Sequence, residues 1–375
     1  MVLKHIFLQN FRSYKKQDFE FDEKATLIVG VNTSGKTNLI EAISMLSSGK
    51  SFRAEKEDQL IKFGQDIARI KGIVKNQENE KNEFEIVLAS GEYSGKRNIS
   101  KKFLVNGVAR KRVDFADNFS AVLFSPEDLD IIIDAPSLRR RFLDNVLEQV
   151  DREYRIAMIA YAKGIRQRNA LLEIARETFR LGSGRAPLRQ GYEGQAGGRN
   201  EKQFEYWDHL VIENGGIITK KREEFLNFAN LTEKEFFDFA AFYDKSIISK
   251  ARLEQYKDAE VGAAVTLVGP HRDDFSVSMY DNVLQTTHDI KAYGSRGQQR
   301  LAILQLKLLE LLYIEKMLGY RPVLLLDDIF SELDEEHINL ILEMLGKQQT
   351  IITTAHKELV PVKIANKMKT IEFEK

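Results

Sequence analysis

Short apolar runs separated by polar residues dominate the first part of the chain and predict strands. One run begins at the N-terminus, where Lys4 and His5 interrupt the apolar residues, and others cover residues 67–74, 82–90 and 102–108. The last of these contains a Val-Asn-Gly sequence, which is typical of a hairpin turn. We therefore expect a sheet-rich N-terminal region.

A strand, a glycine-containing loop and a helix are predicted in direct succession in the same region. Residues Thr26–Gly30 form a short apolar run of the kind found in buried strands. After the loop, residues 36–48 place four apolar side chains on one helical face: Leu39, Ile40, Ile43 and Leu46. The loop is therefore expected at the end of a buried strand.

Helical periodicity takes over in the middle of the chain. It runs from Pro136, which suits the first turn of a helix, to about Thr178, and it resumes from about Gln203 to Phe228. Between them, residues 181–200 are rich in Gly, Arg and Gln and are predicted to be mobile. We interpret the two stretches as a helical arm inserted into the sheet domain, with the Gly-rich segment at or near its tip.

The C-terminal part returns to alternating strands and helices. Residues 236–244 predict a strand, and residues 264–279 predict a strand pair around a turn. Residues 296–317 predict a long helix that is apolar on most faces and therefore buried. Two buried strands are predicted over residues 322–328 and 349–356. The sequence has no repeats and no sustained heptads, which argues against a long coiled coil.

Composition excludes several kinds of chemistry. The chain has 375 residues, enough for more than one domain, and its lack of cysteine excludes disulfides, thiolate metal sites and cysteine nucleophiles. Its 56 Lys+Arg and 56 Asp+Glu residues cancel, so a polyanionic partner would need a local basic patch. Neither a secretion signal nor a membrane-spanning run is recognisable, and we expect a cytoplasmic protein with no membrane partner.

Residues 30–37, Gly-Val-Asn-Thr-Ser-Gly-Lys-Thr, fit the phosphate-loop pattern G-x-x-x-x-G-K-[ST]. Gly30 and Gly35 allow backbone angles that turn several N–H groups toward phosphate, and the helix that starts here adds its positive end. Lys36 supplies charge to the outer phosphates, and Thr37 supplies a hydroxyl for Mg²⁺. The residues predicted to bind nucleotide are Gly30, Val31, Asn32, Thr33, Ser34, Gly35, Lys36 and Thr37.

The second half of a nucleotide site is predicted where the run Val-Leu-Leu-Leu-Asp-Asp ends. Asp327 would hold Mg²⁺, so the predicted metal ligands are Thr37 and Asp327. Asp328 is placed to act as general base toward a water that attacks the γ-phosphate. Together with Lys36, these two carboxylates are the predicted catalytic residues.

A second anion-binding surface is predicted at residues 294–300, Gly-Ser-Arg-Gly-Gln-Gln-Arg. Ser295, Gly297 and the N-terminus of the long helix would form it. Because the chain already has one phosphate loop, this surface suggests a nucleotide held between two subunits. The alternative is an ordinary helix start that contains Ser and Gly.

Two residues are weaker candidates. Asp334, in the sequence Ser-Glu-Leu-Asp at 331–334, could act across a dimer interface or cap a helix. His356 could sense the γ-phosphate or have a structural role.

These motifs, in this order, resemble the ABC-type ATPases with a split head, the group that contains SMC and Rad50. Further motifs are spread over most of the chain: NFRSY (10–14), GKSFR (49–53), LFSPEDL (123–129), PSLRRRFLD (136–144) and GPHRDDF (269–275). With these motifs the chain is similar to the RecF family. Any one of them alone would be weak, whereas the combination is highly specific.

The resemblance implies an α/β fold, namely an ABC-type P-loop ATPase head of the Rad50/SMC kind split by an inserted α-helical arm. The N-terminal lobe would cover residues 1–127, the arm 128–232 and the C-terminal lobe 233–375. The resemblance also implies an ATP-dependent homodimer that requires Mg²⁺ and binds gapped or junction DNA. Such proteins act with RecO and RecR to place RecA on single strands, and their slow ATPase acts as a timer.

The family's residue roles carry over to matching positions. The phosphate loop would bind ATP and Mg²⁺, Asp327 would bind Mg²⁺, and Asp328 would orient the hydrolytic water. The resemblance also places other residues near the nucleotide: Arg12, Ser295, Gly297, Gln298 and His356. Ser295 and its neighbours would meet the γ-phosphate held by the partner subunit.

The sequence departs from the family pattern in four places. Thr33 and Ser34 stand where small Gly or Ala residues are usual, and Thr often stands in the region of His356. The Gly/Arg-rich residues 181–200 differ from the usual arm, and no loop glutamine can be placed.

The basic residues that a DNA partner requires are concentrated in the predicted arm. Residues 151–200 contain about twice as many basic as acidic residues, which favours sequence-independent contact with phosphates. The candidates are Arg139, Arg140, Arg141, Arg152, Arg155, Lys163, Arg166, Arg168, Arg176 and Arg180. The alternatives are a solvated helix face and, for the triple arginine, one side chain buried in an ion pair. Because no aromatic array is apparent, duplex or junction backbone is the expected target.

Four other functions remain as alternatives. The motif spacing and the sequence SRGQQ disfavour a transporter ATPase, and the absent heptads disfavour an SMC-like structural ATPase. An AAA-like defence ATPase would lack the GPHRDDF and GSRGQQR motifs. A scaffold with an inactive nucleotide site is disfavoured by intact Lys36 and Asp327.

Overall fold

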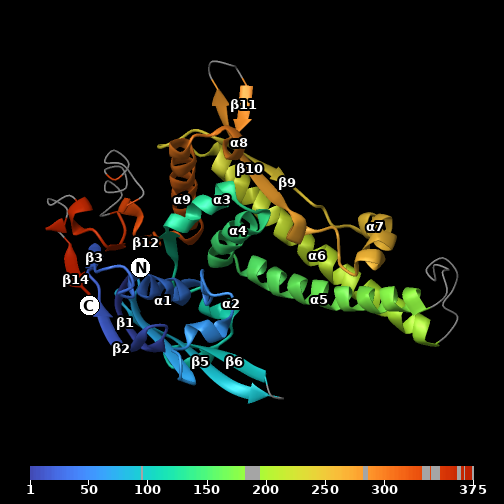
Figure 1. Cartoon of the computed structure of the whole chain (residues 1–375), viewed down its shortest axis with the longest axis horizontal. Helices are drawn as coiled ribbons and strands as arrows, with labels where there is room; N and C mark the ends of the chain where they lie inside the picture. The colour runs from blue at the N-terminus through green and yellow to red at the C-terminus, as the bar shows by residue number, and fades with distance from the viewer. Residues whose placement is uncertain are drawn as a thin grey trace. The chain divides into compact units, whose positions relative to one another are not determined.

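The structure, a computed structural model, divides the chain into two compact units (Figure 1). It describes residues 1–93, 96–181, 195–281, 286–331, 338, 347–360, 365–366 and 368–373. The first unit contains Met1–Leu129, Glu148–Val150 and Ile303–Lys375, and the second contains Asp130–Leu147 and Asp151–Ala302. Each unit is described by itself below.

A parallel five-stranded sheet carries most of the predicted nucleotide motifs of the first unit. Its order is β14 (Lys369–Glu372), β3 (Ala25–Val29), β13 (Thr350–Thr354), β12 (Val323–Asp327) and β8 (Ala121–Phe124). All neighbouring strands are parallel, so their carboxyl ends lie at one edge of the sheet. The predictions of buried strands before the phosphate loop, before Asp327 and before His356 are therefore confirmed.

The second sheet of this unit is antiparallel. Its order is β2 (Tyr14–Glu20), β1 (Val2–Phe11), β4 (Ile67–Lys75), β5 (Lys81–Tyr93), β6 (Lys96–Val105) and β7 (Val108–Arg110). Asn106 and Gly107 join β6 to β7 with φ values of 51° and 75°, as a two-residue hairpin turn with positive φ at both positions requires. The predicted hairpin is therefore confirmed.

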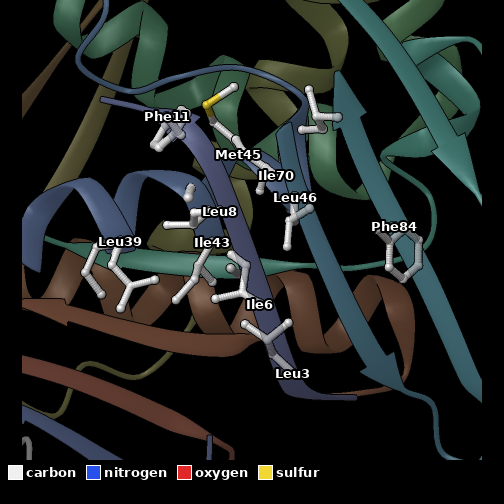
Figure 2. Close-up of a cluster of buried hydrophobic side chains, with 14 of the residues drawn as sticks. Leu3, Ile6, Leu8, Phe11, Leu39, Ile43, Met45, Leu46, Ile70 and Phe84 are labelled. Carbon is white, nitrogen blue, oxygen red and sulfur yellow. The ribbon is translucent and has the colours of Figure 1, made fainter. Parts of the chain in front are cut away.

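Helix α1 (Lys36–Ser48) forms one core with both sheets (Figure 2). Its predicted apolar face is buried against side chains of the antiparallel sheet, among them Leu3, Ile6, Leu8, Ile70 and Phe84. A Cβ at Gly72 of β4 would lie 2.4 Å from a methyl group of Leu46, so helix and sheet are in close contact. This packing fixes the first turn of α1, where the phosphate loop ends. Short helices complete the unit: η1 (Glu57–Leu60), α2 (Arg112–Phe115), η2 (Pro126–Leu129), η4 (Ile329–Ser331) and η5 (Lys357–Leu359).

The second unit is mainly helical. It contains α3 (Asp130–Ile133), most of α4 (Pro136–Val150), α5 (Arg152–Leu181), α6 (Gln195–Leu231), α7 (Lys250–Ala263), η3 (Pro270–Arg272), α8 (Ile290–Tyr293) and the first turns of α9 (Arg296–Leu318). A three-stranded antiparallel sheet has the order β11 (Thr286–Asp289), β10 (Asp274–Asp281) and β9 (Ala240–Asp244).

Helices α5 and α6 lie side by side (Figure 1). A Cβ at Gly164 would come within 2.6 Å of Val211, which shows how closely they pack. The two predicted helical stretches are therefore confirmed, although α6 begins at Gln195 and includes the end of the Gly-rich stretch. Residues 182–194 of that stretch lie outside the described residues.

One prediction of local structure is wrong, and one helix was missed. The expected strand pair over residues 264–279 contains only β10, because Gly269 has a φ of 125° and the 3-10 turn η3 follows it directly. Helix α7 was not predicted, since its exposed faces carry mixed charges and little apolar periodicity marks it. The predicted long helix over residues 296–317 is confirmed as α9. In the part of the chain that the structure describes, no helix is long and apolar enough to span a membrane.

Candidate functional site

The phosphate loop joins the end of β3 to the start of α1, as its sequence predicts. Gly35 has a φ of 104°, which suits glycine, and Thr33 takes a φ of 74°, which is unusual for a β-branched residue. A Cβ at Gly30 would lie 2.8 Å from both Phe373 Cβ and Ser34 Oγ. Gly30 is therefore required by space, whereas Gly35 is required by backbone conformation.

Two polar side chains of this loop, those of Lys36 and Ser34, are held in its interior. Lys36 is only 5% exposed, and its Nζ donates to the carbonyl oxygens of Gly30 at 2.6 Å and Val31 at 3.0 Å. Burial lowers the pKa of Lys36, and the nearby carboxylates of the Asp327–Asp328 pair oppose that shift. Ser34 Oγ is buried, and no described residue forms a hydrogen bond with it. A bound anion would stabilise a loop of this kind.

Asp327 ends β12 and is linked directly to the phosphate loop. Asp327 is 4% exposed, and its carboxylate accepts a hydrogen bond from Thr353 Oγ1 at 2.5 Å. Burial raises the pKa of Asp327, and the nearby hydroxyls of Thr353 and Thr37 reduce that shift only in part. The two predicted metal ligands therefore lie close together, and the donor set of one hydroxyl and one carboxylate fits Mg²⁺ bound together with phosphate oxygens.

Asp328 turns away from the course of β12 at the same sheet edge. Its φ of 51° lies in the left-handed region, which Asp tolerates better than most residues. Its backbone N–H donates to Thr353 O at 3.1 Å, and its Oδ1 accepts from the Ala355 N–H at 3.3 Å. The carboxylate is thus positioned between the ends of β12 and β13.

Arg12 lies beside α1, and all three nitrogens of its guanidinium group donate hydrogen bonds. Nε and Nη2 donate to the two carboxylate oxygens of Glu41 at 2.8 and 2.7 Å, and Nη1 donates to Gln59 O at 3.0 Å. Ser51 Oγ also donates to Glu41, at 2.5 Å. The NFRSY and GKSFR motifs therefore meet at one buried carboxylate, one helical turn beyond Thr37.

Sequence reasoning missed several residues next to the loop. Tyr14 OH donates to Gly35 O at 2.9 Å, and Asn38 donates to Ser13 Oγ at 2.9 Å. A cavity of about 570 Å³ opens beside them, lined by Arg12, Ser13, Asn38, Lys56, Asp58, Gln59, Ile61, Lys62 and Phe63. The available signal was the adjacency of Ser13 and Tyr14 to Arg12 in the NFRSY motif.

His356 lies at the same edge of the parallel sheet as the loop. It follows β13, which pairs with β3, and Gly30 N–H donates to Thr354 O at 3.2 Å. The imidazole is exposed, with Nδ1 3.0 Å from a carboxylate oxygen of Glu358. His356 therefore lies at the sheet edge that carries the phosphate loop, but its side chain makes no described contact with the loop. Asp334 lies outside the described residues.

In the second unit, Ser295 and Gln298 cap the start of α9 reciprocally. The Gln298 N–H donates to Ser295 Oγ at 3.2 Å, and the Ser295 N–H donates to Gln298 Oε1 at 2.8 Å. Ser295 and Gly297 are exposed, and a Cβ at Gly297 would meet no atom closer than Ser295 Oγ at 4.0 Å. The turn therefore has the hydrogen bonds of an ordinary helix cap, and its Ser295 and Gly297 are accessible at the surface.

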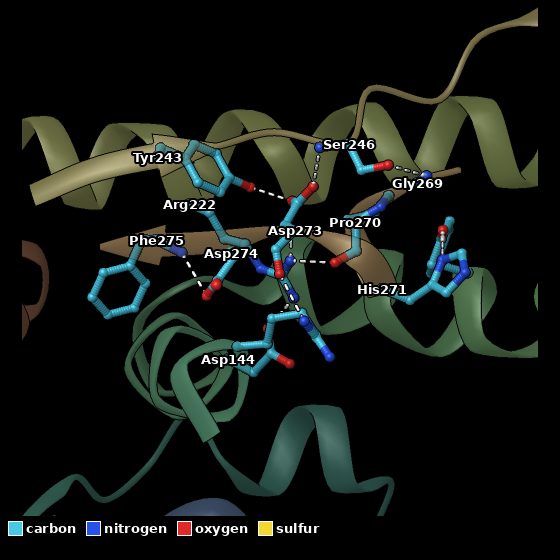
Figure 3. Close-up of polar contacts among 12 residues, drawn as sticks. Asp144, Arg222, Tyr243, Ser246, Gly269, Pro270, His271, Asp273, Asp274 and Phe275 are labelled. Atoms are coloured by element: carbon cyan, nitrogen blue, oxygen red, sulfur yellow. Dashed lines mark hydrogen bonds and ion pairs between the residues drawn. The ribbon is translucent and has the colours of Figure 1, made fainter. Parts of the chain in front are cut away.

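The GPHRDDF motif forms a buried network in the same unit (Figure 3). Asp273 is fully buried and accepts hydrogen bonds from Tyr243 OH, from the Ser246 N–H at 2.7 Å and from Arg222 Nη1 at 3.2 Å. Arg222 also donates to Asp144 at 2.8 Å. The motif thus joins α4, α6 and β9 through fully paired charges.

The burial of the basic candidates corrects the predicted DNA-contacting face. Arg155 is fully buried, and Arg168 is 3% exposed and paired with Asp208 and Glu260, so the prediction that they contact DNA is wrong. The expectation that one arginine of the triple is buried in an ion pair is confirmed for Arg139. Three candidates remain exposed on α5: Arg152, Lys163 and Arg166. The side chain of Arg180 lies outside the described residues.

Known proteins match this chain along nearly all of its length. The family model described as "RecF/RecN/SMC N terminal domain" matches residues 2–375. A protein of Thermoanaerobacter sp. (strain X514) named "DNA replication and repair protein RecF" is 33% identical over 377 residues, covering 95% of each chain. A protein of the same name from Agathobacter rectalis is 35% identical over 367 residues, covering 94% of this chain and 92% of its own.

A solved structure gives the same result for the fold. It is described as the recombination mediator protein RecF with ATP in the RecFOR pathway, and it matches with a TM-score of 0.79 and 32% identity. The match covers 96% of this chain and 93% of that chain. The fold is therefore that of a RecF-type ATPase head, as the resemblance implied.

Proposed function

This chain belongs to the RecF family, and we propose that it is an ATP-dependent DNA-binding protein of recombinational repair and replication restart. The observation that carries the proposal is the contact between the two halves of the nucleotide site. The hydroxyl of Thr37 in the phosphate loop lies near the buried carboxylate of Asp327, and Lys36 Nζ donates to the loop backbone. These are the groups that a nucleoside triphosphate with Mg²⁺ requires.

The proposed roles in hydrolysis follow from this geometry. The loop N–H groups and Lys36 would hold the phosphates, while Thr37 and Asp327 would hold Mg²⁺. The metal, when bound, would neutralise phosphate charge that develops during hydrolysis. Asp328, held between the ends of β12 and β13, would accept the proton of the attacking water. We propose a weak ATPase that DNA stimulates, as the resemblance to the RecF family implies.

The dimer is proposed because Ser295 and Gly297 form an exposed second anion-binding turn in a chain that already has one phosphate loop. Their helix N-terminus would meet the γ-phosphate bound by the partner's phosphate loop, with Gln298 holding the turn. Each ATP would then need two chains. We also propose that Arg12 supports the nucleotide through Glu41 and the adjoining cavity, and that His356 approaches the γ-phosphate from the end of β13.

The DNA partner is proposed to be gapped duplex or a single-strand/double-strand junction. Support comes from the relatives named for replication and repair and from the exposed cations on α5. RecO and RecR are the proposed protein partners in placing RecA, since the matching solved structure is described within the RecFOR pathway. A cytoplasmic location follows from this role. We retain residues 1–127 and 233–375 as the proposed lobes of the head and 128–232 as the proposed arm.

Sedimentation of the purified protein tests the dimer. With Mg²⁺ and ATP, Asp328→Asn should bind but not hydrolyse ATP and should sediment as a dimer. Lys36→Ala should remain a monomer because the loop loses its phosphate-binding charge. If both variants sediment alike with and without ATP, nucleotide does not drive dimerisation and the proposal is wrong.

A further inference from the structure

A buried arginine of α4 holds the segment that leads to the Ser295 turn, and we propose that Arg139 positions this turn for the nucleotide of a partner subunit. The inference rests on the proposed function, because it concerns the surface that would complete the ATP site across the dimer. Its residues all belong to the second unit.

The guanidinium of Arg139 joins two separate segments. Nε and Nη2 donate to the two carboxylate oxygens of Asp274 at 2.6 and 2.9 Å, a two-point contact with the first residue of β10. Nη1 donates to Asp134 O at 2.9 Å, at the corner between α3 and α4. Arg139 is 7% exposed, so these bonds form largely away from water.

Helix α8 is attached to both of these segments. Lys291 Nζ donates to Asp134 O at 3.1 Å, so it shares that carbonyl with Arg139. The side chain of Asp289 caps α8 by accepting from the Lys291 N–H at 2.9 Å. Asp289 also ends β11, which pairs with the strand that Asp274 begins. Arg139 therefore fixes α8 through the shared carbonyl and through the strand ladder.

The Ser295 turn is in turn fixed to α8. The Gly294 N–H donates to Ile290 O at 3.0 Å, and a Cβ at Gly294 would lie 2.6 Å from that oxygen. From the other side of the turn, Gln299 Nε2 donates to Ile290 O at 3.2 Å and to Lys291 O at 3.4 Å. Ile290 is fully buried, and its carbonyl oxygen accepts hydrogen bonds from both sides of the turn, so a shift of α8 would also displace the turn.

The planar fork of Arg139 is what this arrangement needs. Lysine at this position would keep the positive charge but could not bind both oxygens of Asp274 and the Asp134 carbonyl in one plane. The side chain of Asp274 is 29% exposed, so water can replace part of the lost contact and the fold should survive. Arg139 is thus a positioning residue, and Arg139→Lys should misplace Ser295 without affecting the chain's own phosphate loop.

Mixed dimers test this without DNA. Arg139→Lys would have an intact phosphate loop and a displaced Ser295 turn, whereas Lys36→Ala would have the reverse. Ser295→Arg serves as a direct change to the turn, and Arg110→Lys is the matched change at an exposed arginine outside the proposed sites. We would measure ATP binding to each separate chain with a fluorescent ATP analogue, and ATP hydrolysis by each variant alone and in equimolar mixtures.

The expected result has three parts. Arg139→Lys should bind the analogue within about twofold of the unaltered chain, yet hydrolyse ATP at least about tenfold more slowly alone. Mixing it with Lys36→Ala should restore hydrolysis, as mixing Ser295→Arg with Lys36→Ala does, because one complete site forms. Arg110→Lys should behave as the unaltered chain.

Three results would overturn the inference. If Ser295→Arg is restored by mixing but Arg139→Lys is not, Arg139 acts on its own chain's site or on folding. If Arg139→Lys hydrolyses ATP normally, the turn does not depend on it. If Ser295→Arg is not restored either, the site does not span two chains, and the proposed dimer falls together with this inference.

Discussion

The pair formed by Arg12 and Glu41 predicts a large loss of stability when Arg12 is removed. The Glu41 side chain is fully buried and receives three hydrogen bonds, two from Arg12 and one from Ser51. Breaking a buried pair by removing one partner typically costs about 3–5 kcal/mol. The Arg12 side chain is 19% exposed, so water can enter the vacated space and we expect about 2–3 kcal/mol for Arg12→Ala.

Denaturant unfolding of four proteins measures this effect: the unaltered chain, Arg12→Ala, Glu41→Gln and the double variant. The double variant should lie within about 1 kcal/mol of Glu41→Gln, because the uncompensated charge is the main cost. An Arg12→Ala chain less than about 0.5 kcal/mol below the unaltered chain would refute the reasoning. Arg12 would then contribute mainly to nucleotide binding and not to the stability of the fold.

Three further predictions concern the loop, the acidic strand and the arm. Asp327→Asn should raise the melting temperature of nucleotide-free protein at about pH 7.5 but not at about pH 4. Burial raises the pKa of Asp327 in the folded state. The stability that this carboxyl group contributes is therefore present below its unfolded-state pKa and is lost as pH rises through its folded-state pKa. If the melting temperature of Asp327→Asn at the higher pH equals or lies below that of the unaltered chain, this reasoning is contradicted. Gly30→Ala should weaken ATP binding at least about tenfold, because the new Cβ would lie 2.8 Å from atoms of Phe373 and Ser34. An unchanged affinity in an ATP titration would show that the loop accommodates the methyl group. Lys163→Ala with Arg166→Ala should lower the slope of log affinity for duplex DNA against log salt by about two, whereas an unchanged slope would remove this face of α5 from the DNA surface.

The sequence was most informative where a motif and a buried strand coincide. The phosphate loop and Asp327 were predicted correctly at the ends of buried strands, since a continuous apolar run precedes each motif. The position of β13 between β3 and β12 could not be predicted, because the order of strands in a parallel sheet is not encoded in any local pattern. The roles assigned to these residues stay predictions until nucleotide binding is measured.

Charge patterns were the least informative signal. Arg155 and Arg168 have the same local appearance as Arg152 and Arg166, yet two are buried and two are exposed. The burial of Arg168 depends on acidic partners far away in the sequence, such as Glu260. The GPHRDDF motif misled for the same reason: its apolar flanks suggest a strand pair, while its aspartates end in a buried network with α4 and α6.

The central claim is that ATP bound between two chains controls DNA binding, and the affinity of Asp328→Asn for DNA tests it most directly. Fluorescence anisotropy with a labelled gapped duplex would be measured at fixed salt, with Mg²⁺, in the presence and absence of ATP. The account predicts at least about tenfold tighter binding with ATP, abolished by adding Ser295→Arg to the same chain. Equal affinity with and without ATP would contradict it.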